Sequence, residues 1–238
     1  MSHTTIPEPL ETDQWFVDSP ELSEFVATAK EIIASTSGDR AETLNALKPY
    51  FTALLNKQNW LPQNFARPNP DGGLGGGIGQ WLLYRSQEPC LTTSPNSWRG
   101  FSCGRRFANA NANASTLTIF SLVIPPNSIT PVHDHLSWGL VGLYQGKQEE
   151  TVYRRLDKGE TEGFADLEIV GLHQVNRGEI YHLLPPDGDI HSVKATTVFS
   201  PSISIHVMGN DTGSIWRNQY HPEQQSIKSF RSGYSNVP

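Results

Sequence analysis

The feature that most constrains the fold of this chain is a histidine pair, His133 and His135, joined by a third histidine, His191, far downstream. Side chains alternate between the two faces of a β-strand, so residues at i and i+2 project from the same face. A third histidine can join them when a distant strand lies alongside. The three residues therefore favour a β-rich fold carrying a three-nitrogen metal site that leaves coordination positions open.

Composition supports a single β-rich domain. The chain has 238 residues, of which 37% are hydrophobic, with Gly 20 and Pro 17. This mixture favours many turns over a helical bundle. The net charge of −6 argues against nucleic acid or an anionic membrane as a partner. We expect a cytoplasmic protein, because the polar N-terminus lacks a signal pattern and there are only two cysteines, Cys90 and Cys103.

Two helices are predicted in the first third of the chain. Ser19, Pro20 and Glu21 form a helix start, with a hydroxyl cap, a first-turn proline and an early acid. Asp39 resembles the cap of a second helix, which carries its own apolar stripe. We expect Pro49 to kink or split this second helix, because proline lacks the N–H that the helix interior requires.

Short strands fill the rest of the chain, at a spacing typical of a sandwich or small barrel. They are predicted over residues 81–84, 117–124, 139–144, 149–155, 180–184 and 202–208. Residues 109–114 form a low-complexity loop that we expect to be exposed. The expected organisation is therefore a helical segment and glycine-rich loop over residues 1–80, packed on a barrel with a C-terminal tail over residues 81–238.

Two sequence motifs resemble those of the cupin superfamily. The first motif is represented by His133, His135, Gly139 and Gly146, and the second by Pro186, Gly188 and His191. The usual glutamate ligand of the first motif falls at Gly139, which leaves three neutral imidazoles. The resemblance implies a mainly β fold, the cupin double-stranded β-helix (a small β-barrel or jelly roll), preceded here by helices.

Within that superfamily, the three-histidine variant resembles the thiol dioxygenases, the family of cysteine dioxygenase and 3-mercaptopropionate dioxygenase. Ser204 and His206 follow His191 at the spacing of that family's Ser-His-Tyr triad, and Met208 stands at the tyrosine position. The alternation of polar and apolar residues over 202–208 would let Ser204 and His206 point into the barrel.

The resemblance implies roles for eight residues. His133, His135 and His191 would bind Fe(II), although another divalent metal is possible. Ser204 and His206 would orient the substrates, and Arg85, Trp138 and Met208 would contact the substrate. The implied reaction converts a small carboxylate-bearing thiol and O₂ into a sulfinate. A monomer is the default expectation.

Several alternatives stay open. The chain could be another metal-dependent cupin enzyme, such as a non-thiol dioxygenase, a lyase or an isomerase; Met208 and the long segment 88–115 favour this reading. It could also be a non-catalytic metal-binding cupin. Ser204 and His206 could be an internal hydrogen-bonded pair, Arg85 a structural arginine, and Trp138 a core residue.

Overall fold

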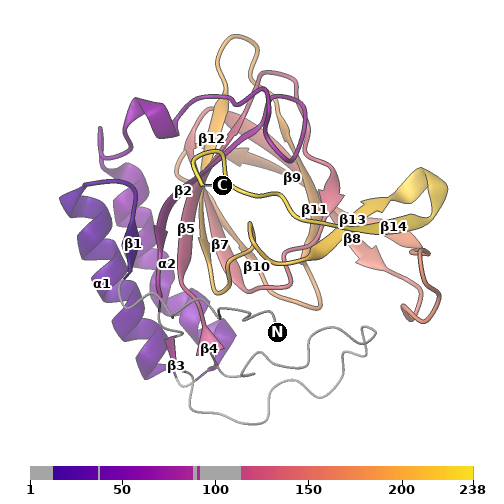
Figure 1. Cartoon of the computed structure of the whole chain (residues 1–238), viewed down its shortest axis with the longest axis horizontal. Helices are drawn as coiled ribbons and strands as arrows, with labels where there is room; N and C mark the ends of the chain where they lie inside the picture. The colour runs from indigo at the N-terminus through magenta and orange to yellow at the C-terminus, as the bar shows by residue number, and fades with distance from the viewer. Residues whose placement is uncertain (1–12, 37, 88–89, 92–113, 238) are drawn as a thin grey trace, which may run out of the picture.

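A computed structural model describes residues 13–36, 38–87, 90–91 and 114–237 (Figure 1). Two helices come first and are followed by a mainly β region. The expectations for Cys103 and for residues 109–113 lie outside the described residues, whereas Ala114 begins a short strand. In the described part of the chain, neither helix combines the length and apolarity needed to cross a membrane.

The helices begin where their caps predict. Helix α1 (Pro20–Ser35) is capped by Ser19, whose hydroxyl accepts a hydrogen bond from the Leu22 N–H at 3.3 Å. Helix α2 (Arg40–Asn56) is capped by Asp39, whose carboxylate accepts one from the Glu42 N–H at 2.9 Å. Each cap satisfies an N–H group that has no partner inside the first helical turn. Two short 3₁₀ turns, η1 (Gln63–Phe65) and η2 (Pro222–Gln224), occur later.

Of the two effects predicted for Pro49, a kink or a split of the second helix, the split is wrong. Helix α2 continues through Pro49 to Asn56. Pro49 cannot donate to the carbonyl of Asn45, but both residues are exposed, so water can satisfy that carbonyl. Leu47 and Phe51 lie on either side of Pro49 along the chain and are fully buried. Burial of the apolar stripe thus holds the helix together across the proline.

The strands form two six-stranded antiparallel sheets and one small pair. The first sheet has the order β1 (Gln14–Trp15), β2 (Gly79–Arg85), β5 (Thr118–Ile124), β12 (Ser202–Met208), β7 (Gly139–Gln145) and β10 (Ile180–Leu183). The second has the order β14 (Ser226–Phe230), β13 (Arg217–His221), β6 (Val132–His133), β11 (Ile190–Ala195), β8 (Lys147–Arg155) and β9 (Leu167–Asn176). Strands β3 (Cys90–Leu91) and β4 (Ala114–Ser115) form the pair.

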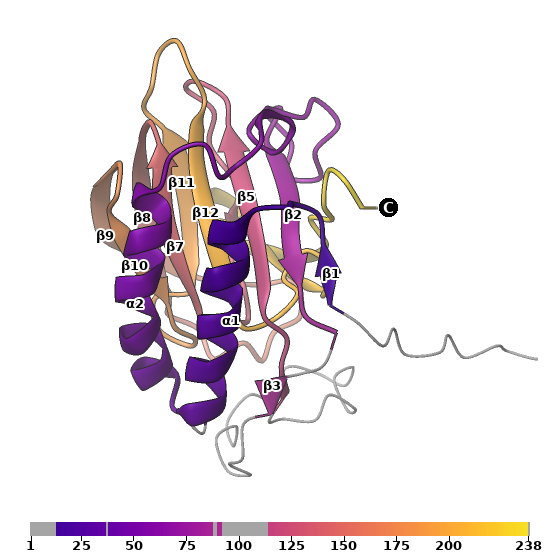
Figure 2. The same ribbon diagram turned by 90° about the vertical axis from the view of Figure 1, so that its left-hand side faces the viewer.

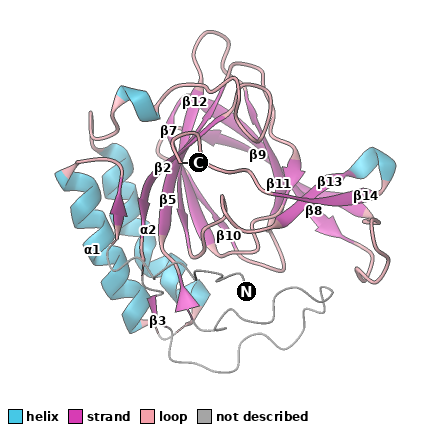
Figure 3. Ribbon diagram, viewed as in Figure 1, coloured by secondary structure: helices cyan, strands magenta, loops and turns pink. Residues whose placement is uncertain are grey.

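The chain winds alternately between the two sheets. Strands β5, β7, β10 and β12 belong to the first sheet, while β6, β8, β9, β11 and β13 belong to the second. Successive strands therefore cross repeatedly from one sheet to the other, and the two sheets wrap around a common interior (Figure 3). This is the jelly-roll arrangement, and it confirms the predicted mainly β class with N-terminal helices.

Hydrophobic packing occupies both faces of the first sheet. Figure 2 shows α1 and α2 covering its outer face. Ile203, Ile205 and Val207 of β12 lie in the hydrophobic cluster that includes the helices. Met208 lies instead in a second cluster, between the sheets. Strand β12 therefore presents its apolar residues to the helices and its even-numbered residues to the barrel interior, as its alternation predicts.

The C-terminal tail completes the edge of β2. Strand β1 pairs only with Tyr84 and Arg85, which leaves the first part of β2 without a strand partner on that side. The Asn236 side chain fills this role: its Nδ2 donates to the Leu82 carbonyl at 3.0 Å, and its Oδ1 accepts from the Leu82 N–H at 2.9 Å. Tyr234 packs in the interior cluster. The tail thus anchors a side chain inside the barrel.

Candidate metal centre

The three predicted ligand histidines meet inside the barrel. His133 ends β6 and lies directly opposite His191 of β11 in the strand register, while His135 follows two residues after His133. Their ring centroids are 4.8–5.0 Å apart, and their potential ligand nitrogens all lie within 4.8 Å of one another. All three are at most 4% exposed. Such a cluster is compact enough for one ion to contact all three rings.

Hydrogen bonds set the tautomers of two of these rings. The Nδ1 of His133 is 2.8 Å from the Pro131 carbonyl, and the Nδ1 of His191 is 2.8 Å from Oε1 of Glu150. A carbonyl or carboxylate oxygen only accepts, so both Nδ1 atoms carry the proton. The Nε2 lone pairs are then free for a metal. The donor set therefore fits a divalent ion, with outer partners of the kind that orient metal-bound histidines.

Burial keeps two of the ligand histidines uncharged. It lowers the pKa of His133 and His135 well below the usual value, and neighbouring imidazoles and the charge of Arg217 lower it further. Both rings are therefore uncharged near neutral pH, which is the form that binds metals. Burial also acts to raise the pKa of Glu150, but its hydrogen bonds with His191 and His173 outweigh this and lower it. Glu150 is thus a carboxylate at neutral pH.

Asp134 fastens the histidine pair to the neighbouring strand β13. Its carboxylate accepts hydrogen bonds from the backbone N–H and the side-chain amide of Asn218, at 2.8 and 2.7 Å, and from the Tyr220 hydroxyl at 2.9 Å. Burial, reinforced by the charge of Asp189, raises the pKa of Asp134 to about 6. The residue between the two ligands therefore anchors their backbone rather than facing the ion.

Asp189 holds the other end of the same segment. Its two oxygens accept from the backbone N–H groups of His135 and Leu136, at 3.1 and 3.0 Å. Leu136 has a φ of 52°, a left-handed conformation that a residue with a side chain rarely adopts. The carboxylate satisfies both N–H groups at this turn, and burial raises its pKa to about 6. Asp189 therefore fixes the direction in which His135 leaves the backbone.

Ser204 and His206 form a pair on the interior face of β12. The Ser204 Oγ lies 3.1 Å from Nε2 of His206, and the Phe120 ring stacks on the imidazole at 4.5 Å between centroids. His206 is buried, and its Nδ1 has no partner among the described residues. Burial lowers its pKa well below the usual value, and electrostatic interactions with the neighbouring imidazoles and with Arg217 lower it further. The pair is therefore electrostatically coupled to the metal ligands.

Arg85 already forms an ion pair and hydrogen bonds with other side chains of the protein. Its Nη1 lies 2.7 Å from Oδ2 of Asp211, and its Nε donates to the Gln14 side chain at 2.9 Å. A substrate carboxylate would have to compete with Asp211 for the same guanidinium. The structure thus shows a structural contact for Arg85, and its role in substrate binding stays a prediction.

The two remaining predicted residues lie in different clusters. Trp138 packs in the cluster that contains the helices, and its ring lies against the backbone of Gly209. Its placement is that of a core residue, the alternative left open above, and its contact with a substrate stays a prediction. Met208 is fully buried in the interior cluster, with its sulfur beside Gly139. Of the two, Met208 is the one placed on the interior face.

Arg217 is a charged residue near the site that sequence reasoning missed. It is 3% exposed, and it donates to the carbonyls of Thr212 and Asp134 and to the Ser232 hydroxyl, each at 2.8 Å. Its charge acts on His133, His135 and His206. No motif marks this residue. The inward position of Glu150 is visible only in the burial of β8, because its sequence neighbours are polar as well.

Comparison with known proteins gives only distant matches. No family model matches the chain. An oxalate oxidase bound to the substrate analogue glycolate is 16% identical over 40% of this chain and 42% of its own, with a TM-score of 0.31. A variant oxalate decarboxylase from Bacillus subtilis is 16% identical over 48% and 24%, with a TM-score of 0.31. A cupin 2 domain-containing protein from Halorhodospira halophila is 12% identical over 48% and 57%, with a TM-score of 0.31.

The chain spans less than half the length of the oxalate oxidase it matches. The fold is therefore defined by the arrangement of its own strands. Two antiparallel sheets wound alternately, with three histidines meeting between them, define a cupin-type jelly roll. The fold and the donor atoms together make the cluster a candidate site for a divalent metal.

Proposed function

We propose that this protein is a non-haem iron dioxygenase that oxidises a small, carboxylate-bearing thiol to its sulfinate. The observation that carries the proposal is the set of three inward imidazoles with Ser204 and His206 on the adjoining interior face. A ferrous ion held by the histidines would supply the redox chemistry that places both atoms of O₂ on sulfur. The thiol would give up one proton, so thiol and O₂ together account for the sulfinate and that proton.

His206 is suited to handle that proton. Its Nε2 is engaged with Ser204, and its Nδ1 has no partner among the described residues, so Nδ1 is available as donor or acceptor according to the tautomer. Because burial keeps the ring neutral, Nδ1 can take a proton from the thiol or hold a hydrogen bond to the product. Phe120 fixes the plane of the ring by stacking. Ser204 fixes its rotation.

Arg217 is our candidate for the group that attracts the substrate carboxylate. Its guanidinium is buried, and three of its five N–H groups have acceptors among the described residues. Its positive charge lies close enough to act on the histidines. A planar guanidinium suits a carboxylate better than an ammonium does.

The test is O₂ consumption by anaerobically Fe(II)-loaded protein with cysteine, 3-mercaptopropionate and cysteamine, with sulfinate measured by mass spectrometry. We expect one sulfinate for each O₂ from a thiol that carries a carboxylate, and little from cysteamine. His191→Ala should abolish both activity and iron retention, whereas Ser204→Ala should retain iron and lose turnover. No thiol-dependent O₂ uptake by the metal-loaded protein would overturn the proposal.

Met208 favours a second candidate, another metal-dependent cupin enzyme that does not act on thiols. Methionine cannot donate the hydrogen bond that a phenol gives to bound substrate. Met208 is fully buried and belongs to the apolar cluster between the sheets. Product formation from a non-thiol substrate, with or without O₂ uptake, would support this candidate in place of the first.

A further inference from the structure

We propose that His173, an exposed histidine of β9, is a positioning residue for the metal site. It acts by holding Glu150, which in turn holds the ligand His191. The inference rests on the three-histidine site and is independent of which substrate the site takes.

The strand register builds this chain of contacts. Strand β8 lies between β9 and β11 in the second sheet. Glu150 of β8 is directly opposite His173 of β9, and His191 of β11 is opposite Val152, two residues further along β8. Glu150 and His191 are therefore diagonal neighbours, a relationship that long side chains can bridge. One carboxylate thus touches an imidazole on each side.

The two contacts use both oxygens of the carboxylate. Oε1 accepts from Nδ1 of His191 at 2.8 Å, and Oε2 lies 3.2 Å from Nδ1 of His173. The Glu150 side chain is 4% exposed and that of His191 is 1% exposed, whereas 58% of the His173 side chain is exposed. His173 is therefore the outermost member of a contact chain that begins at the surface and ends at a metal ligand.

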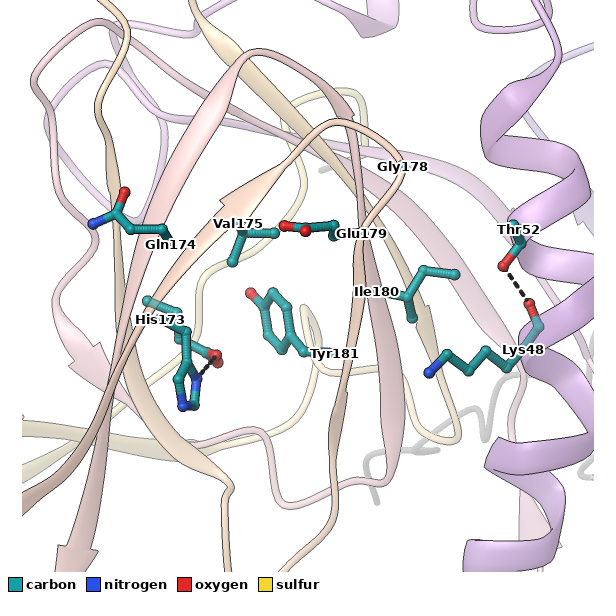
Figure 4. Close-up of a pocket in the computed structure, with 10 residues that line it drawn as sticks. Lys48, Thr52, His173, Gln174, Val175, Gly178, Glu179, Ile180 and Tyr181 are labelled. Carbon is teal, nitrogen blue, oxygen red and sulfur yellow. Dashed lines mark hydrogen bonds and ion pairs between the residues drawn. The ribbon is translucent and has the colours of Figure 1, made fainter.

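Glu150 is one of the residues that line a surface pocket. The pocket has a volume of about 440 Å³ and lies between the edge strands β9 and β10 and helix α2. Figure 4 shows His173 and Tyr181 in this pocket, with a dashed line for the hydrogen bond of His173 to Glu150. The Tyr181 hydroxyl is buried and has no partner among the described residues, so it does not restrain Glu150. Among the described contacts, the hydrogen bond with His173 is the one that holds Oε2 of Glu150.

Gly171 lies close to the imidazole of His173. It precedes His173 by two residues on β9, so the two share a strand face. A Cβ at position 171 would come within 3.1 Å of Nε2 of His173. The imidazole therefore lies over the bare backbone of the glycine while it reaches toward Glu150. A side chain at 171 would force the ring to shift.

The experiment measures metal affinity, with no turnover required. Co(II) and Fe(II) would be titrated anaerobically against a competing chelator. Glu150→Gln gives the reference effect, since losing the carboxylate partner of a ligand histidine costs roughly tenfold to a hundredfold in metal affinity. We expect His173→Phe to weaken binding about threefold to tenfold, because it acts one contact further out. His173→Asn should restore most of the loss, because its amide can donate from the position of Nδ1.

The matched control is His182→Phe, which changes another exposed histidine with no contact to Glu150 among those described. The thermal midpoint of each metal-free protein separates positioning from folding: we expect His173→Phe to leave it unchanged while reducing the rise caused by metal. Gly171→Ala, which keeps the imidazole but displaces it, should weaken binding in the same direction. Unchanged affinity in His173→Phe, or an equal loss of stability with and without metal, would overturn the proposal.

Discussion

Arg85 and Asp211 form an ion pair, with 2.7 Å between Nη1 and Oδ2. The other oxygen of Asp211 accepts a hydrogen bond from the Tyr234 hydroxyl at 2.8 Å. The end of β2, the segment after β12 and the C-terminal tail are therefore joined at one carboxylate. Both members of the pair are largely buried, at 20% and 14% side-chain exposure, so the contact is shielded from solvent.

From this geometry we expect Arg85→Gln to lower the free energy of unfolding by about 1 kcal/mol, since a partly buried ion pair exceeds the small value of an exposed one. Chemical denaturation would measure the change, and a cycle with Asp211→Asn would isolate the pair. The KM for a carboxylate-bearing thiol should stay the same in Arg85→Gln and rise in Arg217→Lys. A tenfold rise in KM for Arg85→Gln with unchanged stability would contradict this assignment.

Met208 allows a direct test of space on the interior face. Its sulfur would lie 2.5 Å from a Cβ placed at Gly139, so there is no spare volume between Met208 and the backbone of β7. We expect Met208→Leu to cost less than about 1.5 kcal/mol and Met208→Tyr to cost about 1–3 kcal/mol through overpacking. Thermal unfolding of both variants would check this. A Met208→Tyr protein as stable as the unmodified one would show that the interior has room for a phenol.

Gly209 supports the packing of Trp138 on the other side of the sheet. A Cβ at position 209 would lie 2.1 Å from an atom of the Trp138 ring. Gly209→Ala should therefore destabilise the protein by about 1–3 kcal/mol. Trp138→Phe, which shortens the ring system, should recover part of that loss in the double variant. If the two changes simply add, the ring and the glycine are not coupled.

Asp157 predicts a pH-dependent contribution to stability. Its hydrogen bonds with Arg155, at 2.9 and 2.8 Å, hold the pKa of the carboxyl well below the usual value. A lowered pKa in the folded state stabilises the protein above the unfolded value of about 3.9, and the contribution is lost as pH falls below it. We expect Asp157→Asn to cost about 1 kcal/mol at pH 7 and progressively less below about pH 4. A constant difference across that range would contradict the expectation.

The outline of the fold could be read from local signals. Ser19 and Asp39 cap their helices through contacts three residues away, which a linear pattern reveals. The alternation of β12 specified which residues face the helices and which face the interior. The helix through Pro49 was missed because its continuity depends on burial against the sheet, which no local rule contains.

The supporting contacts of the site were harder to foresee. The motif spacing brought the three histidines together, but the partners of Asp134 and the position of Arg217 depend on how β13 lies beside β6. The substrate-binding role predicted for Arg85 depended on its place in the chain, whereas in the structure Arg85 pairs with Asp211, which is far away in sequence. Such pairings follow from strand order, which residue type and spacing leave undetermined.

Because His133 and His191 face each other across β6 and β11, an ion that binds both would report on strand alignment. A shift of β11 by one residue would turn His191 to the opposite face and disperse the ligands. Only the aligned form would hold all three ligands together, so only that form would be stabilised by metal binding. In this protein the ion would therefore stabilise the correct register of β6 and β11, in addition to any part it has in a reaction.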